Sequence, residues 1–434
     1  MDKARRAAVL ALMQLHRGRY TADAADSVLS ASSLSPRDGA FAAAVFFTAA
    51  EHLYTLDTLL RPFSRRPLEK LDLEVRAILE TALAQILYMR VPARAAVNEA
   101  VSLAAVFKKG SAGGFINAVL RKAASAELPV DAFSSEEERI CVLYSLSRPV
   151  AAALMKAMPD DYEAFLKASW YSEELGLRVN TLKTTREELS AALAEQGHKV
   201  RPGPLPNALW ARISGGVAAE PLFESGLYHV QNGASQYACA CVEARAGMRV
   251  LDLCAAPGGK SATLAEEMGG GQGLTVCDVN KARLAKAVDL FRRLGIVDAV
   301  FLENDAAGYE KSLEGQDAVL CDVPCSGLGV LATKPDLRYG GGENYENLPS
   351  LQLKILATAA RYVKQGGRLV YSTCTVRQEE NEQVVHAFLA KMPNFRLLEP
   401  YICPQNALVR DKMMTILPQN TGLAGFFVAS MERL

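Results

Sequence analysis

The chain of 434 residues is half hydrophobic and 22% charged, and it carries no formal net charge. This composition is typical of a globular protein with room for two or three domains, and the balanced charge gives no global sign of a nucleic-acid partner. The nine cysteines are odd in number and follow no regular framework, which excludes a disulfide scaffold and predicts a reducing cytoplasm.

No membrane-spanning segment is predicted, because the longest apolar stretch, residues 40–50, is too short to cross a bilayer. The first 19 residues place basic side chains before a short apolar stretch, as a signal peptide does. Polar residues follow at once and no small-residue cleavage site is present, so a helix is the better interpretation.

Residues 1–126 are predicted to form an all-α bundle. Apolar residues recur at helical spacing, as in Val9, Leu12 and Met13, and prolines such as Pro92 mark the turns between helices. Residues 1–125 hold 17 Lys and Arg against 11 Asp and Glu, an excess that fits a polyanion clamp but is also common by chance. A bundle that only buries these apolar stripes would reveal no function.

Residues 127–228 are predicted to form further helices and a small α/β module of open topology. A charged run at 134–139 leads into helix, and a short extended piece follows at 177–182. Three prolines at 202, 204 and 206 then mark a loop before another hydrophobic piece.

Residues 229–434 are predicted to form a doubly wound, Rossmann-like α/β domain. Short β-rich runs alternate with helical stretches such as 281–294 and 351–363, a pattern typical of parallel βαβ units. The predicted strands are 249–253, 274–277, 299–302, 318–321 and 368–371, with late strands at 395–398 and 426–431. In such sheets ligands bind at the carboxyl ends of the strands.

The loop after the first of these strands has the composition of a nucleotide-binding loop. Gly258 and Gly259 allow a ligand to approach the backbone, and the helix that follows offers free N–H groups. A Walker P-loop is excluded because Cys254 stands where its first glycine is needed, and the dinucleotide fingerprint G-x-G-x-x-G is absent. An adenosine-type site without a pyrophosphate remains.

Three successive strands end on an aspartate. Asp278 is placed to accept ribose hydroxyls, Asp305 to meet an adenine amino group, and Asp322 ends the fourth strand. A single strand-terminal Asp is more often a helix cap than a ligand, but three of them after a glycine-rich loop favour a ligand site.

Two cysteines follow the fourth and fifth strands. Cys325 and Cys374 are both flanked by small polar residues and are expected to face the same crevice. A lone Cys at a strand end is usually a small buried hydrophobe, whereas two beside a cofactor site favour a function. Helix N-termini after the two loops are expected to lower the pKa of both thiols.

Several segments together resemble the family of RNA cytosine-carbon-5 methyltransferases. They are residues 252–260, Asp-Val-Pro-Cys-Ser-Gly at 322–327, Ser-Thr-Cys-Thr at 372–375, Arg-Val-Asn at 178–180, Lys334 with Asp336, and Gly-Phe-Phe at 425–427. The amino-terminal helices, including 96–100 and 114–121, resemble the NusB-like RNA-binding domain. The combined likeness covers nearly the full length and resembles the members that act on small-subunit (16S) ribosomal RNA.

The resemblance implies the chemistry and the residues that carry it. Carbon 5 of cytosine is a poor nucleophile until a thiolate adds to carbon 6, a role that the resemblance gives to Cys374. It implies that Asp322 binds the ring nitrogen and the exocyclic amine of the base, and that Cys325 helps to release the product. The implied cofactor is S-adenosyl-L-methionine, and the residues implied to surround it are Cys254, Ala255, Ala256, Pro257, Gly258, Gly259, Lys260, Asp278, Arg283, Asp305 and Asp322.

The expected partner is RNA, with neither a DNA nor a membrane partner, and a monomer is the default expectation. A target carbon inside a duplex is unreachable, so the cytosine must be single-stranded or flipped out. One departure from the family pattern is Asn232, where an aspartate is usual. Two alternatives stay open: methylation of a tRNA cytosine, and a non-catalytic RNA-binding assembly factor that keeps the fold.

Overall fold

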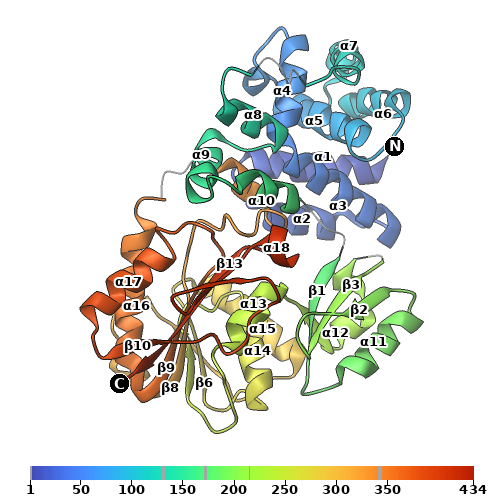
Figure 1. The fold of residues 1–434 in the computed structure, drawn as a ribbon. Helices are drawn as coiled ribbons and strands as arrows, with labels where there is room; N and C mark the ends of the chain where they lie inside the picture. The colour runs from blue at the N-terminus through green and yellow to red at the C-terminus, as the bar shows by residue number, and fades with distance from the viewer. Residues whose placement is uncertain (1, 129–132, 171–173, 215, 341–344) are drawn as a thin grey trace. The chain divides into compact units, whose positions relative to one another are not determined.

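The structure, a computed structural model, describes residues 2–128, 133–170, 174–214, 216–340 and 345–434. The chain divides into two compact units. The first comprises residues 1–156 with 333–342, and the second comprises residues 157–332 with 343–434. Figure 1 traces both units along the chain.

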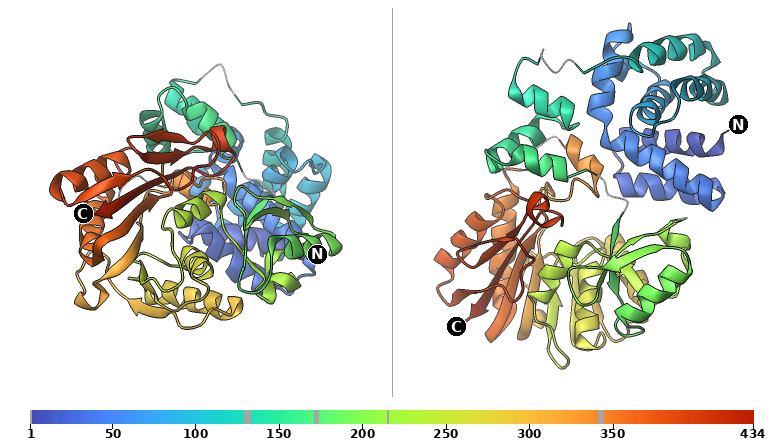
Figure 2. Two further views of the ribbon diagram at one scale, coloured as in Figure 1. Left: turned by 60° about the horizontal axis from the view of Figure 1, so that its bottom comes forward. Right: turned by 45° about the vertical axis from the view of Figure 1, so that its right-hand side comes forward.

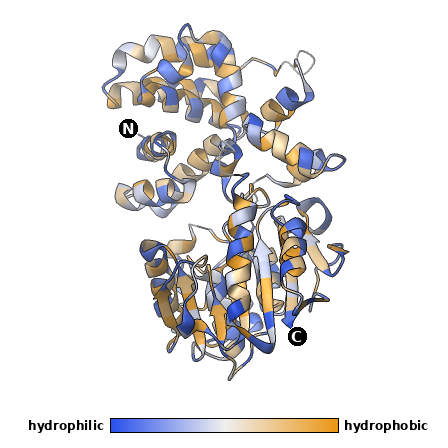
Figure 3. Cartoon of the chain, turned by 90° about the vertical axis from the view of Figure 1, so that its left-hand side faces the viewer, coloured by the Kyte–Doolittle hydropathy of each residue, from blue (hydrophilic) through white to orange (hydrophobic). Residues whose placement is uncertain are grey.

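The first unit is all-α, as predicted. Helices α1 to α7 contribute buried apolar residues to a shared core that includes Leu12, Phe46 and Ile78. Figure 3 shows hydrophobic and hydrophilic residues alternating around these helices. The helices are α1 (Lys3–His16), α2 (Thr21–Leu29), α3 (Pro36–Glu51), α4 (Leu53–Leu60), α5 (Leu73–Leu87), α6 (Ala93–Val106), α7 (Gly113–Ala123), α8 (Glu136–Leu143) and α9 (Arg148–Ala157).

A short segment from far along the chain completes the first unit. It contains the 3-10 helix η7 (Pro335–Tyr339), and the side chain of Arg338 is fully buried there. Arg338 Nη1 donates to the carbonyl of Tyr144 at 2.9 Å, and Nη2 lies 3.5 Å from the Glu51 carboxylate. The hydroxyl of Tyr339 donates to the Glu51 carbonyl at 2.9 Å. We call residues 333–340 the tether segment.

The second unit begins with α10 (Tyr162–Ala168) and a small four-stranded antiparallel sheet in the order β2-β3-β1-β4. Helix α11 covers one face of this sheet, as Figures 1 and 2 show. It begins with a capping box between Thr185 and Glu188. The elements of this module are β1 (Leu175–Val179), α11 (Arg186–Glu195), β2 (Lys199–Pro202), β3 (Ala208–Arg212), α12 (Pro221–Glu224) and β4 (Tyr228–Val230).

The rest of the second unit is built on a nine-stranded mixed sheet, which confirms the predicted Rossmann-like fold. Five neighbouring strands, β9-β8-β5-β6-β7, are parallel, and β13, β12 and β11 continue the sheet antiparallel beyond β9. Strand β10 pairs with β13. The strands are β5 (Val250–Asp252), β6 (Leu274–Asp278), β7 (Val300–Glu303), β8 (Gln316–Asp322), β9 (Val363–Thr373), β10 (Phe395–Leu398), β11 (Leu408–Arg410), β12 (Met413–Ile416) and β13 (Phe426–Arg433).

Helices cover both faces of this sheet. Alternate strand residues point to opposite faces, so Leu320 belongs to one apolar core and Cys321 to the other. The first core holds α13 (Gly233–Ala240), α14 (Gly259–Met268) and α15 (Lys281–Leu294), and the second holds α16 (Leu348–Tyr362) and α17 (Glu382–Lys391). A short helix, α18 (Pro418–Thr421), precedes β13.

Across the described residues, no single helix has both the length and the apolar character needed to cross a bilayer. The bent pair α8 and α9 passes that test only when the two helices are taken together.

Replacing Arg338 by Ala is expected to lower the free energy of unfolding of the first unit by about 3 kcal/mol, because it removes a buried cation from Glu51. Urea unfolding of the full chain, with hydrogen exchange of peptides from α3 and α4, measures the effect. The exposed Arg66, replaced by Ala, is the matched control. Equal protection of these peptides in both variants would contradict the assignment.

Candidate active site

Two parallel strands bring the predicted site residues together. In the register of β8 with β9, Asp322 pairs with Ser372 at the carboxyl ends of both strands. The loop after β8 then carries Cys325, and the residue after β9 is Cys374. The two cysteines, 49 positions apart in the chain, therefore reach the same place because their strands are neighbours.

The two thiols are in contact. Cys325 Sγ and Cys374 Sγ are 3.3 Å apart, and both side chains are half-buried. The hydrogen bond with Cys374, helped by burial, raises the pKa of Cys325 well above its usual value. The expectation that a helix N-terminus lowers this pKa is wrong, because the contact with the second sulfur outweighs it.

A charged pair lies beside the thiols. Lys260 Nζ donates to Asp322 Oδ2 at 2.7 Å, and the hydroxyl of Ser372 donates to Asp322 Oδ1 at 2.8 Å. Burial alone would lower the pKa of Lys260, but the charge of Asp322 raises it above its usual value. Lys260 is thus a stable ammonium, and it is also coupled electrostatically to Cys374.

The loop between β5 and α14, together with the first two residues of α14, contains the predicted cofactor residues 254–260. Gly258 has a φ of +101°, and a Cβ at this position would lie 2.7 Å from the Cβ of Ala287. Glycine is required there because α15 packs directly against the loop. Burial raises the pKa of the Cys254 thiol well above its usual value. Cys254 therefore lines the loop as a neutral thiol and is not a further thiolate.

Two predicted cofactor residues hold this loop in place. Asp278 Oδ2 accepts from the amide of Ala256 at 3.0 Å, and Oδ1 accepts from the amide of Asn280 at 2.9 Å. Arg283 Nη2 donates to the carbonyl of Ala256 at 2.5 Å. Asp278 is buried and Arg283 is exposed, and together they satisfy the amide and the carbonyl of Ala256.

The neighbourhood of this loop fits an adenosine-type cofactor. A Cβ added to Gly259 would meet no atom within 4 Å in the described part of the chain, so a ligand has room beside its backbone. At the end of β7, Asp305 is exposed, while the buried Nδ2 of Asn304 has no hydrogen-bond partner among the described residues. Adenine offers acceptors for such a donor. The link from Asp305 to the loop is indirect. The amide of the preceding residue, Asn304, donates to the carbonyl of Asp278 at 3.1 Å.

The Gly-Phe-Phe motif at residues 425–427 lies beside the two cysteines and Lys260. The amide of Gly425 donates to the carbonyl of Gly329 at 2.8 Å, and the amide of Gly329 donates to the carbonyl of Cys374 at 2.9 Å. The ring of Phe426 lies 5.2 Å from Lys260 Nζ. The start of β13 is therefore part of the wall around the two cysteines.

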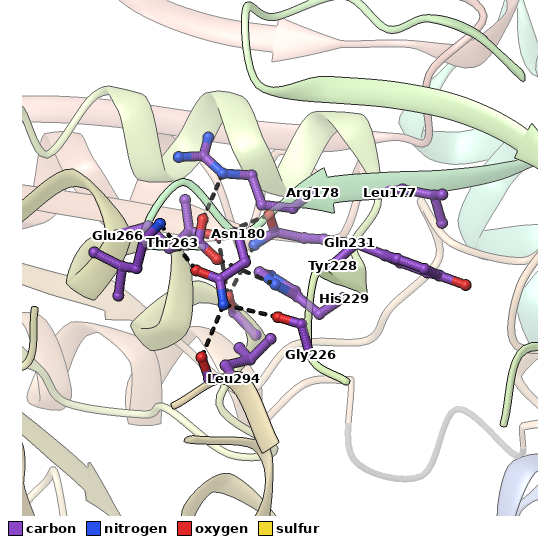
Figure 4. Close-up of polar contacts among 12 residues, drawn as sticks. Leu177, Arg178, Asn180, Gly226, Tyr228, His229, Gln231, Thr263, Glu266 and Leu294 are labelled. Carbon is purple, nitrogen blue, oxygen red and sulfur yellow. Dashed lines mark hydrogen bonds and ion pairs between the residues drawn. The ribbon is translucent and has the colours of Figure 1, made fainter. Parts of the chain in front are cut away.

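The small module is joined to α14, the helix that begins beside Lys260. Figure 4 shows Arg178 of β1 directed at this helix, where its Nε donates to Glu266 at 2.7 Å. Gln231 donates to the carbonyl of Gly259 at 3.1 Å and accepts from the hydroxyl of Thr263 at 2.8 Å. Nearby, Asn232 accepts from the amide of Ala234 at 2.8 Å. Asn232 thus caps α13, a role that an aspartate would fill equally well.

Sequence reasoning missed one buried residue of the site, Glu380. It follows Cys374 within a run of charged and polar residues that is typical of a solvated surface, yet its side chain is fully buried and binds Ser326, next to Cys325. Glu379 and Glu382 stand near it in the sequence, and nothing in the pattern distinguishes the buried carboxylate from them. In the described part of the chain, no cluster of three or more His, Cys, Asp or Glu could hold a metal ion.

Comparison with known families gives three matches that follow one another along the chain. The family described as 16S rRNA methyltransferase RsmB/F matches residues 240–432, and the NusB family matches residues 2–125. The ferredoxin-like domain of RsmF/B-like methyltransferases matches residues 150–212.

Individual relatives match over most of their length. A Bacillus subtilis protein named "Probable ribosomal RNA small subunit methyltransferase B" is 32% identical over 98% of both chains. The ribosomal RNA small subunit methyltransferase B of Klebsiella pneumoniae is 32% identical over 84% of both chains. Among solved structures, that of PH0851 is 26% identical with a TM-score of 0.86, covering 100% of this chain and 99% of its own.

A methyltransferase homologue from Pyrococcus horikoshii, 24% identical with a TM-score of 0.60, shares the fold over 70% of this chain and 100% of its own. The sequence identity of the full-length relatives and the order of the three matched domains establish that the chain belongs to the 16S rRNA methyltransferase RsmB/F family.

Proposed function

We propose that the chain transfers a methyl group from S-adenosylmethionine to carbon 5 of a cytosine in small-subunit (16S) ribosomal RNA, through a covalent adduct with Cys374. The observation that carries the proposal is the contact of Cys374 with Cys325, with Asp322 and Lys260 beside them. The printed names of the relatives support ribosomal RNA as the substrate.

Cys374 supplies the nucleophile. Its sulfur adds to carbon 6 of the cytosine, and this addition makes carbon 5 an enamine carbon that can accept a methyl group. The electron pair displaced by this addition moves to the ring nitrogen, which takes up a proton from solvent, and Asp322 accepts from that N–H and from the exocyclic amine. The contacts of its two oxygens with Lys260 and Ser372 fix its orientation before the base arrives.

The loop of residues 254–260 holds the cofactor, together with Asp278, Arg283 and Asp305. S-adenosylmethionine supplies an electrophilic methyl group on a positively charged sulfur. The acidic residues favour that positive charge, and Asp278 and Arg283 also keep the loop in shape through Ala256. The unpaired amide of Asn304 is an additional donor for the adenine.

Cys325 releases the product. Its contact with Cys374 is the main reason that its pKa is raised. Once Cys374 is bonded to carbon 6, its sulfur is a neutral thioether, and Cys325 can lose its own proton to solvent. The Cys325 thiolate then takes the proton from carbon 5, the bond between carbon 6 and sulfur breaks, and its electron pair leaves with Cys374 as a thiolate. Because Cys325 keeps its proton while it contacts the unreacted Cys374, attack precedes release.

RNA binding is assigned to residues 1–126 and to the module of residues 127–228, with the catalytic domain at 229–434. Lys and Arg side chains contact phosphates, and the target base leaves its stack to reach Cys374. All nine cysteines are free thiols, which fits a reducing cytoplasm. The proposal includes a monomer with neither a DNA nor a membrane partner.

Incubation with radiolabelled S-adenosylmethionine and protein-free small-subunit ribosomal RNA is expected to place label on a cytosine, mapped by nuclease digestion and mass spectrometry. Transfer to tRNA instead would change the substrate assignment. Tight cofactor binding without transfer to any RNA would favour a non-catalytic assembly factor.

The variants Cys374→Ser and Cys325→Ser are expected to fail at different steps of the reaction. The first removes the nucleophile and lowers turnover by at least about 1,000-fold. The second still attacks but releases slowly, so a covalent protein–RNA adduct accumulates and is seen as a shifted band on a denaturing gel. Full activity of both variants would rule out the two-cysteine chemistry.

The Asp278→Ala variant is expected to weaken cofactor binding by about 10- to 100-fold, because it removes the carboxylate that holds Ala256 and faces the cofactor loop. Isothermal titration with S-adenosylhomocysteine measures this change. Asp289→Asn, on the exposed side of α15, is the control and keeps the affinity of the unmodified chain. An unchanged affinity for the Asp278 variant would remove the loop from the cofactor site.

A further inference from the structure

A fully buried carboxylate lies between the two cysteine loops. Glu380 stands just before α17, and its side chain accepts four hydrogen bonds. Oε2 accepts from the amide of Ser326 at 2.9 Å and from Gln352 Nε2 at 2.9 Å. Oε1 accepts from the hydroxyl of Ser326 at 2.5 Å and from Arg377 Nη1 at 3.0 Å.

These contacts hold the residues on both sides of Cys325. Ser326 follows Cys325 directly, and Gln352 Nε2 also donates to the carbonyl of Pro324 at 3.0 Å, just before it. The hydroxyl of Ser326 lies 2.7 Å from that of Thr375, the residue after Cys374. One carboxylate thus joins the loop of Cys325 to the loop of Cys374 and to α16.

The loop of Cys325 depends on these side-chain contacts more than the position of Cys374 does. Residues 323–330 form neither helix nor strand, whereas Cys374 directly follows the long strand β9, which is paired on both sides with β8 and β13. A loop without a backbone ladder needs other partners for its polar groups. Burying a carboxylate costs several kcal/mol unless it is well paired, and here four donors offset that cost.

We propose that Glu380 is a positioning residue for the release step: it holds Cys325 against Cys374 by fixing Pro324 and Ser326. The inference rests on the proposed two-cysteine chemistry and assigns Glu380 no contact with the cofactor or the base. Without Glu380, attack by Cys374 continues, and removal of the carbon-5 proton by a displaced Cys325 slows.

The variant Glu380→Gln tests this. An amide nitrogen replaces one acceptor oxygen, so it faces donors and two of the four hydrogen bonds are lost. Turnover on small-subunit ribosomal RNA is expected to fall by about 100-fold, as for a reacting group displaced by about 1 Å. The KM for S-adenosylmethionine is expected to stay within about twofold, because uniform binding is untouched.

The decisive readout is the covalent adduct. Glu380→Gln is expected to accumulate a methylated protein–RNA adduct, as Cys325→Ser does, whereas a purely structural defect lowers attack and release together and traps nothing. Ser326→Ala removes one hydroxyl donor but keeps the backbone amide, and it is expected to give a smaller amount of the same adduct. Glu379→Gln is the matched control, since it changes the neighbouring carboxylate, which lies 3.9 Å from Arg377.

The outcomes separate the two proposals. An adduct with Cys325→Ser but none with folded Glu380→Gln overturns the role of Glu380 alone. Absence of an adduct in every variant, with normal methyl transfer, overturns the covalent chemistry and the role of Glu380 with it. If Glu380→Gln does not fold, Ser326→Ala and Gln352→Leu decide the question: adduct in both supports the role, and adduct in neither overturns it.

Discussion

The parallel pairing of β8 with β9 is the constraint on which the site depends. It places Asp322 beside Ser372, and the loops that follow bring Cys325 and Cys374 into contact. Lys260 joins them from α14, whose position depends on β5, the other neighbour of β8. A change of register by one residue would turn alternate side chains to the opposite face and separate the two sulfurs. The buried apolar residues on both faces of the sheet prevent such a change, because it would expose them to water. The two apolar cores therefore keep the two sulfurs in contact.

Much of this arrangement was predictable from the sequence. The strand–helix alternation after residue 229 predicted the parallel strands, and polar or reactive residues at their carboxyl ends, such as Asp322 and Cys374, predicted a shared crevice. These predictions rely on local patterns, because period and strand-end position are visible in a short window. Pairing between neighbouring strands then follows from general rules of α/β topology. Of the antiparallel edge, β10 and β13 were predicted as isolated late strands, whereas β11 and β12 were missed.

Buried charges were not predictable, because burial is decided by partners far away in the chain. Glu380 stands among other acidic residues, and Arg178 was known only as part of a motif, yet each is an internal ion that other elements surround. A carboxylate or guanidinium inside a protein is stable only with its donors or acceptors in place. Such residues therefore report tertiary structure and leave no periodic signal. The same applies to Asp278, a buried carboxylate whose predicted place near the cofactor includes a bond to the loop backbone.

The tether segment constrains how the two units can be separated in evolution. The chain leaves the catalytic unit after residue 332, contributes Arg338 and Tyr339 to the interior of the helical unit, and returns before residue 343. This excursion lies between Cys325 and Cys374 in the sequence. Removal of residues 1–156 would leave the Arg338 guanidinium without its partners Tyr144 and Glu51. A chain trimmed at this end therefore also has to change residues 333–340, far from the cut.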